Sequence, residues 1–285
     1  MSKAPSTTIV RLLLINDFSH LSIVKILLLV AALFLSSLTH AQSKYELTQE
    51  QEAYVSRQEA ALRKVIENSI KQERARKKFA YPVAKNPAAR KALDEELLRL
   101  GLDPTLFVLS DSPKVDRGDA RASLTDGYIY VSTRTVLQNS AHLPFILAHE
   151  YAHVKLEHPL RQALGAYRMA AMYCFKCVKG KDPIDVALDV LENSRDAVNT
   201  LSRKYELEAD SWAVRFISEQ GIYVDYLSNF SDPRYGCLDV EEEMHPSCLA
   251  RARNAYLIVG TDYQHLLTND IERLKVFQTG AFTID

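Results

Sequence analysis

Two histidines and a glutamate in one short helical segment are the residues of this chain best suited to metal chemistry. The segment 147–154 contains the pattern H-E-x-x-H, formed by His149, Glu150 and His153. Because positions i and i+4 lie on one face of an α-helix, both imidazoles can point at a single metal ion. Glu150 lies about a quarter turn away, where it can act on a water bound to that metal without serving as a ligand. The alternative is a pair of core histidines bonded to backbone carbonyls, because so short a pattern also occurs by chance.

A second segment with a helical pattern carries two carboxylates at the same spacing. Glu206 and Asp210 stand at i and i+4 of the run 205–212, on the face expected to be buried. Buried anions require cations or hydrogen-bond donors, so we expect this helix to face the two histidines. Glu206 would complete a His₂Glu zinc site with an open fourth position, and Asp210 would accept the free ring N–H of His149. The alternative is a solvated helix with two exposed acids.

A longer zinc motif with a third histidine as ligand is excluded by the sequence. That motif requires glycine and histidine where Leu156 and Pro159 stand. His158 lies off the ligand face of the predicted helix, and we expect it to be a surface residue near the helix end.

The pattern of the whole chain predicts an α+β fold that is mostly helical, with a small and mainly antiparallel sheet packed on the H-E-x-x-H helix. Helices are expected near residues 44–80, 88–100, 140–159, 164–178 and 185–201, followed by the carboxylate helix to about 219. Strands are expected near 106–109, 121–123 and 128–132, with Asp126-Gly127 as a turn signal. An exposed strand could hold an extended peptide by main-chain hydrogen bonds, although it could also serve for packing alone.

Composition and the N-terminus indicate an exported globular protein. The 285 residues are 47% apolar and 25% charged, which is enough for a sizeable core, and the net charge of −1 gives no argument for nucleic acid. Lys25, the apolar run 26–35 and the small residues before position 42 predict a signal peptide over 1–41, with an uncleaved anchor as the alternative. We therefore expect a helical segment over 42–104 and the metal-binding domain over 105–285, which together form a single compact domain.

The four cysteines are even in number, which suggests disulfides in an exported protein. They are Cys174, Cys177, Cys237 and Cys248. Three pairings are possible, and the sequence does not choose among them. A Cys₄ zinc site ranks second, and a thioredoxin-like redox site is disfavoured because no βαβ pattern surrounds Cys174.

A long loop is predicted over residues 221–244, a length typical of a lid or binding loop. The run His245-Pro246-Ser247 then opens a final helical region that contains Arg251.

Together these motifs resemble the zinc metallopeptidase family that includes the HtpX-type heat-shock proteases, the CAAX prenyl endopeptidases and the periplasmic proteases that maintain outer-membrane assembly. The resemblance covers roughly residues 106–253 and implies a gluzincin-like domain that binds one zinc ion per chain. It implies ligand roles for His149, His153 and Glu206 and an acid/base role for Glu150. His245 and Arg251 become catalytic candidates that contact the substrate or the transition state.

The chain departs from the family in ways that shape the expected biology. It has one N-terminal apolar run where the membrane-embedded members have several, no helical repeats, and Asp119-Ala120 where the family often has Asn-Ala. The resemblance therefore implies a repeat-free exported protease of the bacterial periplasm, or one anchored to the membrane and facing the periplasm. Its expected partners are unfolded or misassembled envelope proteins, with possible membrane association.

The expected function is that of a zinc-dependent endopeptidase in which Glu150 activates a zinc-bound water. A second hypothesis is a zinc-stabilised, chaperone-like binding protein with little turnover, whose fourth zinc position is occupied, for example by His245. A third is a zinc hydrolase that acts on non-peptide amides such as cell-wall crosslinks.

Overall fold

The computed structural model describes residues 46–116, 120–138, 141–226, 230 and 245–262. The chain divides into two units, residues 1–49 and 50–285, and only residues 46–49 of the first are described. The predicted signal peptide, most of the predicted loop 221–244 and Cys237 therefore lie outside the described residues. Among the described residues, no helix combines the length and the apolar character that crossing a membrane requires. The boundary expected at 104/105 stays a prediction.

The described part of the chain is mostly helical, as expected for the α+β class. Its helices, in chain order, are α2 (Gln49–Ala75), α3 (Pro87–Leu100), α4 (Pro113–Asp116), α5 (Thr133–Gln138), α6 (Leu143–Lys155), α7 (His158–Tyr173), α8 (Phe175–Val178), α9 (Pro183–Asn193), α10 (Arg195–Glu219) and α12 (Cys248–Asp262), with the 3-10 helix η2 (Pro104–Leu106) before the first strand.

The sheet is small, as predicted, but it is mixed rather than mainly antiparallel. It contains β1 (Phe107–Ser110), β2 (Ala120–Ala122) and β3 (Ile129–Ser132) in the order β1-β3-β2. β3 pairs with β1 in parallel and with β2 antiparallel. The chain passes through α4 and β2 between β1 and β3, and this crossover brings β3 back in the direction of β1. Every residue of β1 and β3 is buried, which is typical of strands covered on both faces.

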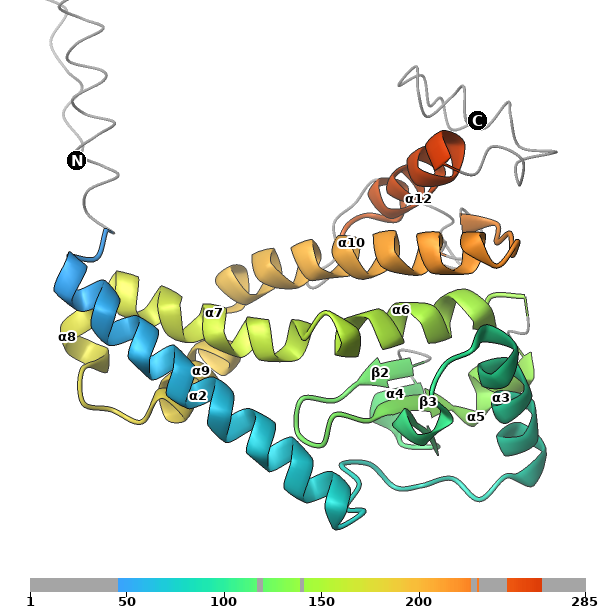
Figure 1. Ribbon diagram of the computed structural model, residues 1–285, viewed down its shortest axis with the longest axis horizontal. Coiled ribbons are helices and arrows are strands. Elements are labelled where there is room, and N and C mark those ends of the chain that lie inside the picture. The colour runs from blue at the N-terminus through green and yellow to red at the C-terminus, as the bar shows by residue number, and fades with distance from the viewer. Residues whose placement is uncertain (1–45, 117–119, 139–140, 227–229, 231–244, 263–285) are drawn as a thin grey trace, which may run out of the picture. The chain divides into compact units, whose positions relative to one another are not determined.

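Helix α6 lies between α10 and the sheet (Figure 1). Its residues Leu147 and Ala148 are fully buried in the main apolar core, which also takes in side chains of α3, α10 and α12. Burial of a leucine side chain contributes about 1.5–3 kcal/mol, so this packing fixes the rotation of α6 about its axis. The same rotation directs the histidine face of α6 towards α10.

Two of the helices predicted from the apolar periodicity of the sequence are interrupted in the structure. The predicted helix 140–159 ends at Lys155, and a new helix, α7, begins at His158. Glu157 between them has φ 55°, a left-handed conformation that interrupts a helix. The predicted helix 185–201 is likewise divided at Ser194, after which α10 continues without a break through the carboxylate segment.

Arginine side chains connect helix α2 to α7 and to the turn between β2 and β3. Arg168 of α7 forms ion pairs with Glu52 and Glu59. Near the other end of α2, Arg74 donates hydrogen bonds to the carbonyl oxygens of Asp126 and Gly127, in the turn between β2 and β3. Arg74 therefore connects the C-terminal end of α2 to this turn.

The three described cysteines form disulfides, as predicted. Cys174 and Cys177 are bonded to each other across the junction of α7 and α8. Cys248 is also disulfide-bonded, and no described cysteine is a free thiol. This excludes the Cys₄ zinc site that the sequence left open.

Candidate metal centre

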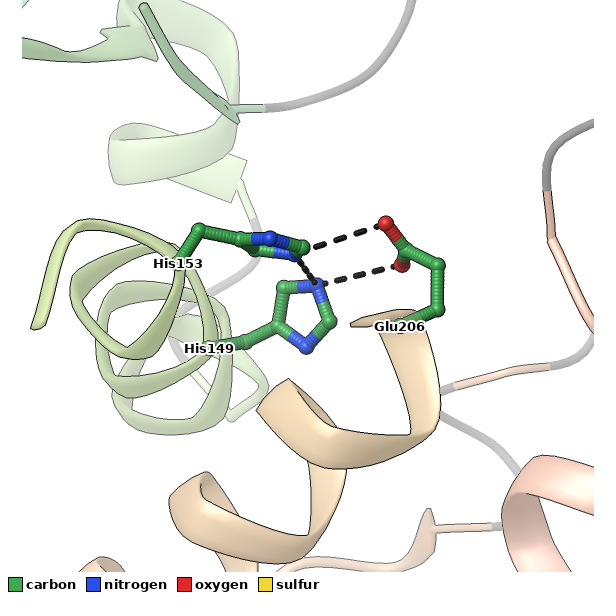
Figure 2. Close-up of side chains that lie close together, drawn as sticks. All are labelled: His149, His153 and Glu206. Atoms are coloured by element: carbon green, nitrogen blue, oxygen red, sulfur yellow. Dashed lines mark hydrogen bonds and ion pairs between the residues drawn. The ribbon is translucent and has the colours of Figure 1, made fainter. Parts of the chain in front are cut away.

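Three side chains from two helices converge on one point, as Figure 2 shows. Nε2 of His149 and Nε2 of His153, both on α6, lie 3.1 Å apart. The carboxylate of Glu206 on α10 approaches both rings, with Oε2 lying 3.3 Å from His149 Nε2 and Oε1 lying 3.4 Å from His153 Nε2. The structure thus brings together the three residues expected to bind a metal.

The donor set fits a zinc ion. Bonds of about 2.0–2.2 Å to a tetrahedral zinc place ligand atoms roughly 3.3–3.6 Å apart, close to the spacings of these nitrogen and oxygen atoms. Two imidazoles and one carboxylate are also a ligand set that zinc hydrolases use. Oε2 of Glu206 is buried without a well-oriented hydrogen bond to any described residue. A cation at the centre of the three side chains would satisfy this oxygen.

Buried negative charge dominates the electrostatics of the centre. Burial alone would favour the neutral acid, but the neighbouring imidazoles of His149 and His153 hold the pKa of Glu206 well below its usual range. Burial also disfavours a charged imidazole, yet Asp210 and Glu206 raise the pKa of His149 to about 10. Without a metal, the carboxylates therefore draw a proton onto the imidazole, which indicates a site that favours a bound cation.

Asp210 lies behind His149, at the position predicted for it. Its Oδ1 lies 2.9 Å from Nδ1 of His149, and its side chain is fully buried. Arg251 of α12 donates to both oxygens of this carboxylate, over 2.7 Å and 2.6 Å. Burial raises the pKa of Asp210, but the charge and hydrogen bonds of Arg251 outweigh this and lower it below the ordinary value. Asp210 is thus ionised. Nδ1 of His149 is not oriented for a hydrogen bond to it here, but a small rotation of the ring would let Asp210 accept the Nδ1–H.

Arg251 and His245, two of the three catalytic candidates, lie at different distances from the centre. Arg251 contacts the centre mainly through Asp210, and its nearest approach to the Glu206 carboxylate is 3.8 Å. His245 lies closer, with Nδ1 3.1 Å from Oε2 of Glu206 and a side chain that is 43% exposed. Both residues line a cavity of about 780 Å³ that also contains the three converging side chains.

Glu150 lies between this centre and the sheet. Its Oε2 accepts a hydrogen bond from the backbone N–H of Ala122 in β2, over 2.7 Å. β2 is at one edge of the sheet, and its outer side pairs with no other strand among the described residues. The candidate base is therefore within reach of any peptide that extends along this edge.

His158 is not the surface residue that the sequence suggested. It is 2% exposed, and its Nδ1 lies 3.0 Å from Nδ1 of His153. Its Nε2 lies 3.2 Å from Oε2 of Glu208 on α10. The prediction was wrong because it continued the periodicity of α6 through Glu157, where the chain turns and begins α7. Pro159, typical of a first helical turn, was the sequence signal for this new start.

The His₂Glu convergence and the adjacent carboxylate of Glu150 are typical of a zinc hydrolase site. A model of the family described as Peptidase family M48 matches residues 89–258. The chain therefore belongs to peptidase family M48, whose members are zinc metallopeptidases, and the family resemblance noted in the sequence is confirmed. Searches of curated proteins and of solved structures gave no match.

Proposed function

We propose that this protein is a zinc-dependent endopeptidase that cleaves unfolded or misassembled polypeptides. The observation that carries the proposal is the convergence of His149, His153 and Glu206, with Glu150 on the side that faces the sheet edge. Three protein ligands with one free position are typical of catalytic rather than structural zinc.

The roles of the residues follow from their positions. Zinc, when bound by His149, His153 and Glu206, lowers the pKa of a coordinated water to about 7 and polarises a carbonyl oxygen. Glu150 can take a proton from that water on its carboxylate and pass it to the leaving amine. Asp210 holds the proton of His149 on Nδ1, so that Nε2 of this ring keeps its lone pair for the metal.

The shape of the site favours an extended substrate. A peptide that lies along β2 could form main-chain hydrogen bonds with this strand, and its amide groups would pass close to Glu150. An unfolded chain presents its backbone in this way more readily than a folded domain does, which supports unfolded polypeptides as the substrate class. With the predicted export signal, this leads to misassembled envelope proteins in the bacterial periplasm as the proposed targets.

The proposal is tested by metal content and by cleavage of a casein-type unfolded substrate. Wild-type protein is expected to hold one zinc ion per chain and to cleave, and a chelator should stop cleavage. The Glu150→Gln variant should keep its zinc and its fold but lose cleavage, because the amide cannot accept a proton. Substantial residual cleavage by the purified variant would reject the role of Glu150.

A zinc-stabilised, chaperone-like binding protein is the second candidate, and the position of His245 favours it. Nδ1 of His245 lies 3.1 Å from the Glu206 carboxylate, although it does not belong to the group of converging ligand atoms. A shift of this side chain towards the two imidazoles would bring it into the open position. Such a protein would suppress aggregation of an unfolded polypeptide without shortening it, whereas the endopeptidase would produce fragments that disappear when a chelator is added.

A further inference from the structure

A chain of side chains leads away from His153 on the side opposite the metal centre. Nδ1 of His153 faces Nδ1 of His158 over 3.0 Å, and Nε2 of His158 faces Oε2 of Glu208 over 3.2 Å. Arg161 donates to both oxygens of Glu208, over 2.7 Å and 3.3 Å. These contacts join α6, α7 and α10 directly behind one of the three expected ligands.

The Nδ1 atoms of both expected ligand histidines lead to a carboxylate that is paired with an arginine. Nδ1 of His149 meets Asp210, which is paired with Arg251. Nδ1 of His153 reaches a carboxylate–guanidinium pair as well, but through the ring of His158. A histidine that binds a metal through one nitrogen usually donates the other N–H to a fixed partner, which sets the tautomer and the orientation of the ring.

The direction of the hydrogen bonds follows from the chemistry of Glu208. A carboxylate that accepts from Arg161 has no proton to give, so the nitrogen of His158 that faces it must carry the hydrogen. A neutral His158 then has its lone pair on Nδ1 and accepts the Nδ1–H of His153. His153 is left with a lone pair on Nε2, the atom that faces His149 and Glu206.

Packing holds the ring of His158 in this orientation. It stacks on Tyr205 of α10, with 4.9 Å between ring centroids and an interplanar angle of 16°. Arg161 covers the same tyrosine ring at 4.7 Å. The left-handed turn at Glu157 places His158 at the first position of α7, pointing inwards.

We propose that His158 is a positioning residue for the metal centre, which accepts the Nδ1–H of His153 and donates to Glu208 so that Nε2 of His153 is presented to the metal. This inference rests on the proposed zinc site. It assigns a function to a histidine that is not itself one of the expected zinc ligands. A purely structural role, as a satisfied buried polar group, is the alternative that an experiment must separate.

Three substitutions of His158 separate these roles, because each keeps different hydrogen bonds. His158→Asn places an amide oxygen near the position of Nδ1, where it can accept from His153. His158→Gln places an amide N–H near the position of Nε2, where it can donate to Glu208, and His158→Leu does neither. Gln162→Leu is the matched control, since Gln162 also projects from α7 but bonds to Ser202 of α10.

The readout is zinc affinity, measured by competition with a chromophoric chelator on the purified full-length protein. His158→Leu and His158→Gln are expected to weaken zinc binding by about 10–100-fold, the usual effect of losing such a partner. His158→Asn and Gln162→Leu should bind zinc as the wild type does. If His158 has only a structural role, its substitutions should lower the stability of the metal-free protein. The zinc affinities of His158→Asn and His158→Gln should then be equal.

The outcomes distinguish this inference from the function on which it rests. Wild-type protein that does not bind zinc would overturn the proposed function and the positioning role together. Wild-type protein that binds zinc, with unchanged affinity in His158→Leu, would overturn the positioning role alone. If His158→Leu does not fold, the comparison of Asn with Gln decides, and equal zinc affinities in these two variants would overturn the proposal.

Discussion

The carboxylate of Glu150 is bonded to the backbone N–H of Ala122, 2.7 Å away, so the candidate base is attached to the edge strand along which a substrate would lie. The contact joins α6 to β2 at the point where the metal centre meets the sheet. The three-residue strand β2 would therefore position two things at once. It would hold the substrate backbone, and it fixes the carboxylate of Glu150 that would transfer the proton.

Ala122→Pro should remove this single donor. Proline lacks the N–H, and it is tolerated on edge strands when its nitrogen points away from the neighbouring strand. We expect kcat to fall by up to about 100-fold, because small displacements of a catalytic group are costly. Zinc content should remain normal. Ala122→Val keeps the N–H and is the control, so equal cleavage rates for the two variants would show that the contact is unimportant.

Replacing Arg251 alone should lower the free energy of unfolding more than replacing Arg251 and Asp210 together. Asp210 is fully buried, and Arg251→Met would remove the guanidinium and both of its hydrogen bonds, leaving His149 as the remaining ionic contact of this carboxylate. The expected cost is up to about 3–5 kcal/mol. Arg251→Met combined with Asp210→Asn should recover part of this loss. Urea unfolding of the metal-free proteins in a double-mutant cycle measures the coupling, and simple additivity would argue against the pairing.

The metal-free protein should lose stability as the pH rises from neutral. Because Asp210 and Glu206 raise the pKa of His149 to about 10, the protonated ring stabilises the fold fully below its unfolded pKa of about 6.5. This contribution is lost as the pH rises towards 10. Zinc binding requires the neutral ring and should strengthen over the same range.

Thermal unfolding with and without chelator, between about pH 5.5 and 10, tests this opposite dependence. His149→Asn is the control, since its metal-free form should lack the decline attributed to His149. A metal-free wild-type midpoint that stays constant across this range would contradict the charge balance inferred for the centre.

Loss of the Cys174–Cys177 disulfide should have a small and local effect. The bond closes a loop with a sequence separation of 3, and such short loops constrain the unfolded chain little. We expect Cys174→Ser/Cys177→Ser to lower the free energy of unfolding by about 2 kcal/mol or less. Zinc content should be unchanged. A loss of zinc in this variant would mean that the α7–α8 junction supports the metal centre.

Most of the centre could be predicted because its key spacings lie within single helices. His149 and His153 on α6, and Glu206 and Asp210 on α10, are each one helical turn apart, so the 3.6-residue period alone places each pair on one face. Their chemistry, two buried imidazoles and two buried carboxylates, then indicated that the two helices face each other. The prediction of a small sheet before the H-E-x-x-H helix likewise rested on patterns within short segments of the sequence.

The features that could not be predicted depend on how separate elements meet. A left-handed turn at Glu157 brings His158 inwards, and the crossover through α4 and β2 makes β3 parallel to β1. The contact of Ala122 with Glu150 likewise depends on packing between β2 and α6. Residue types and helical spacing by themselves determined which side chains could bind a metal. Only the tertiary structure decided which groups support those side chains, because contacts between distant segments depend on turns and packing rather than on any periodic pattern.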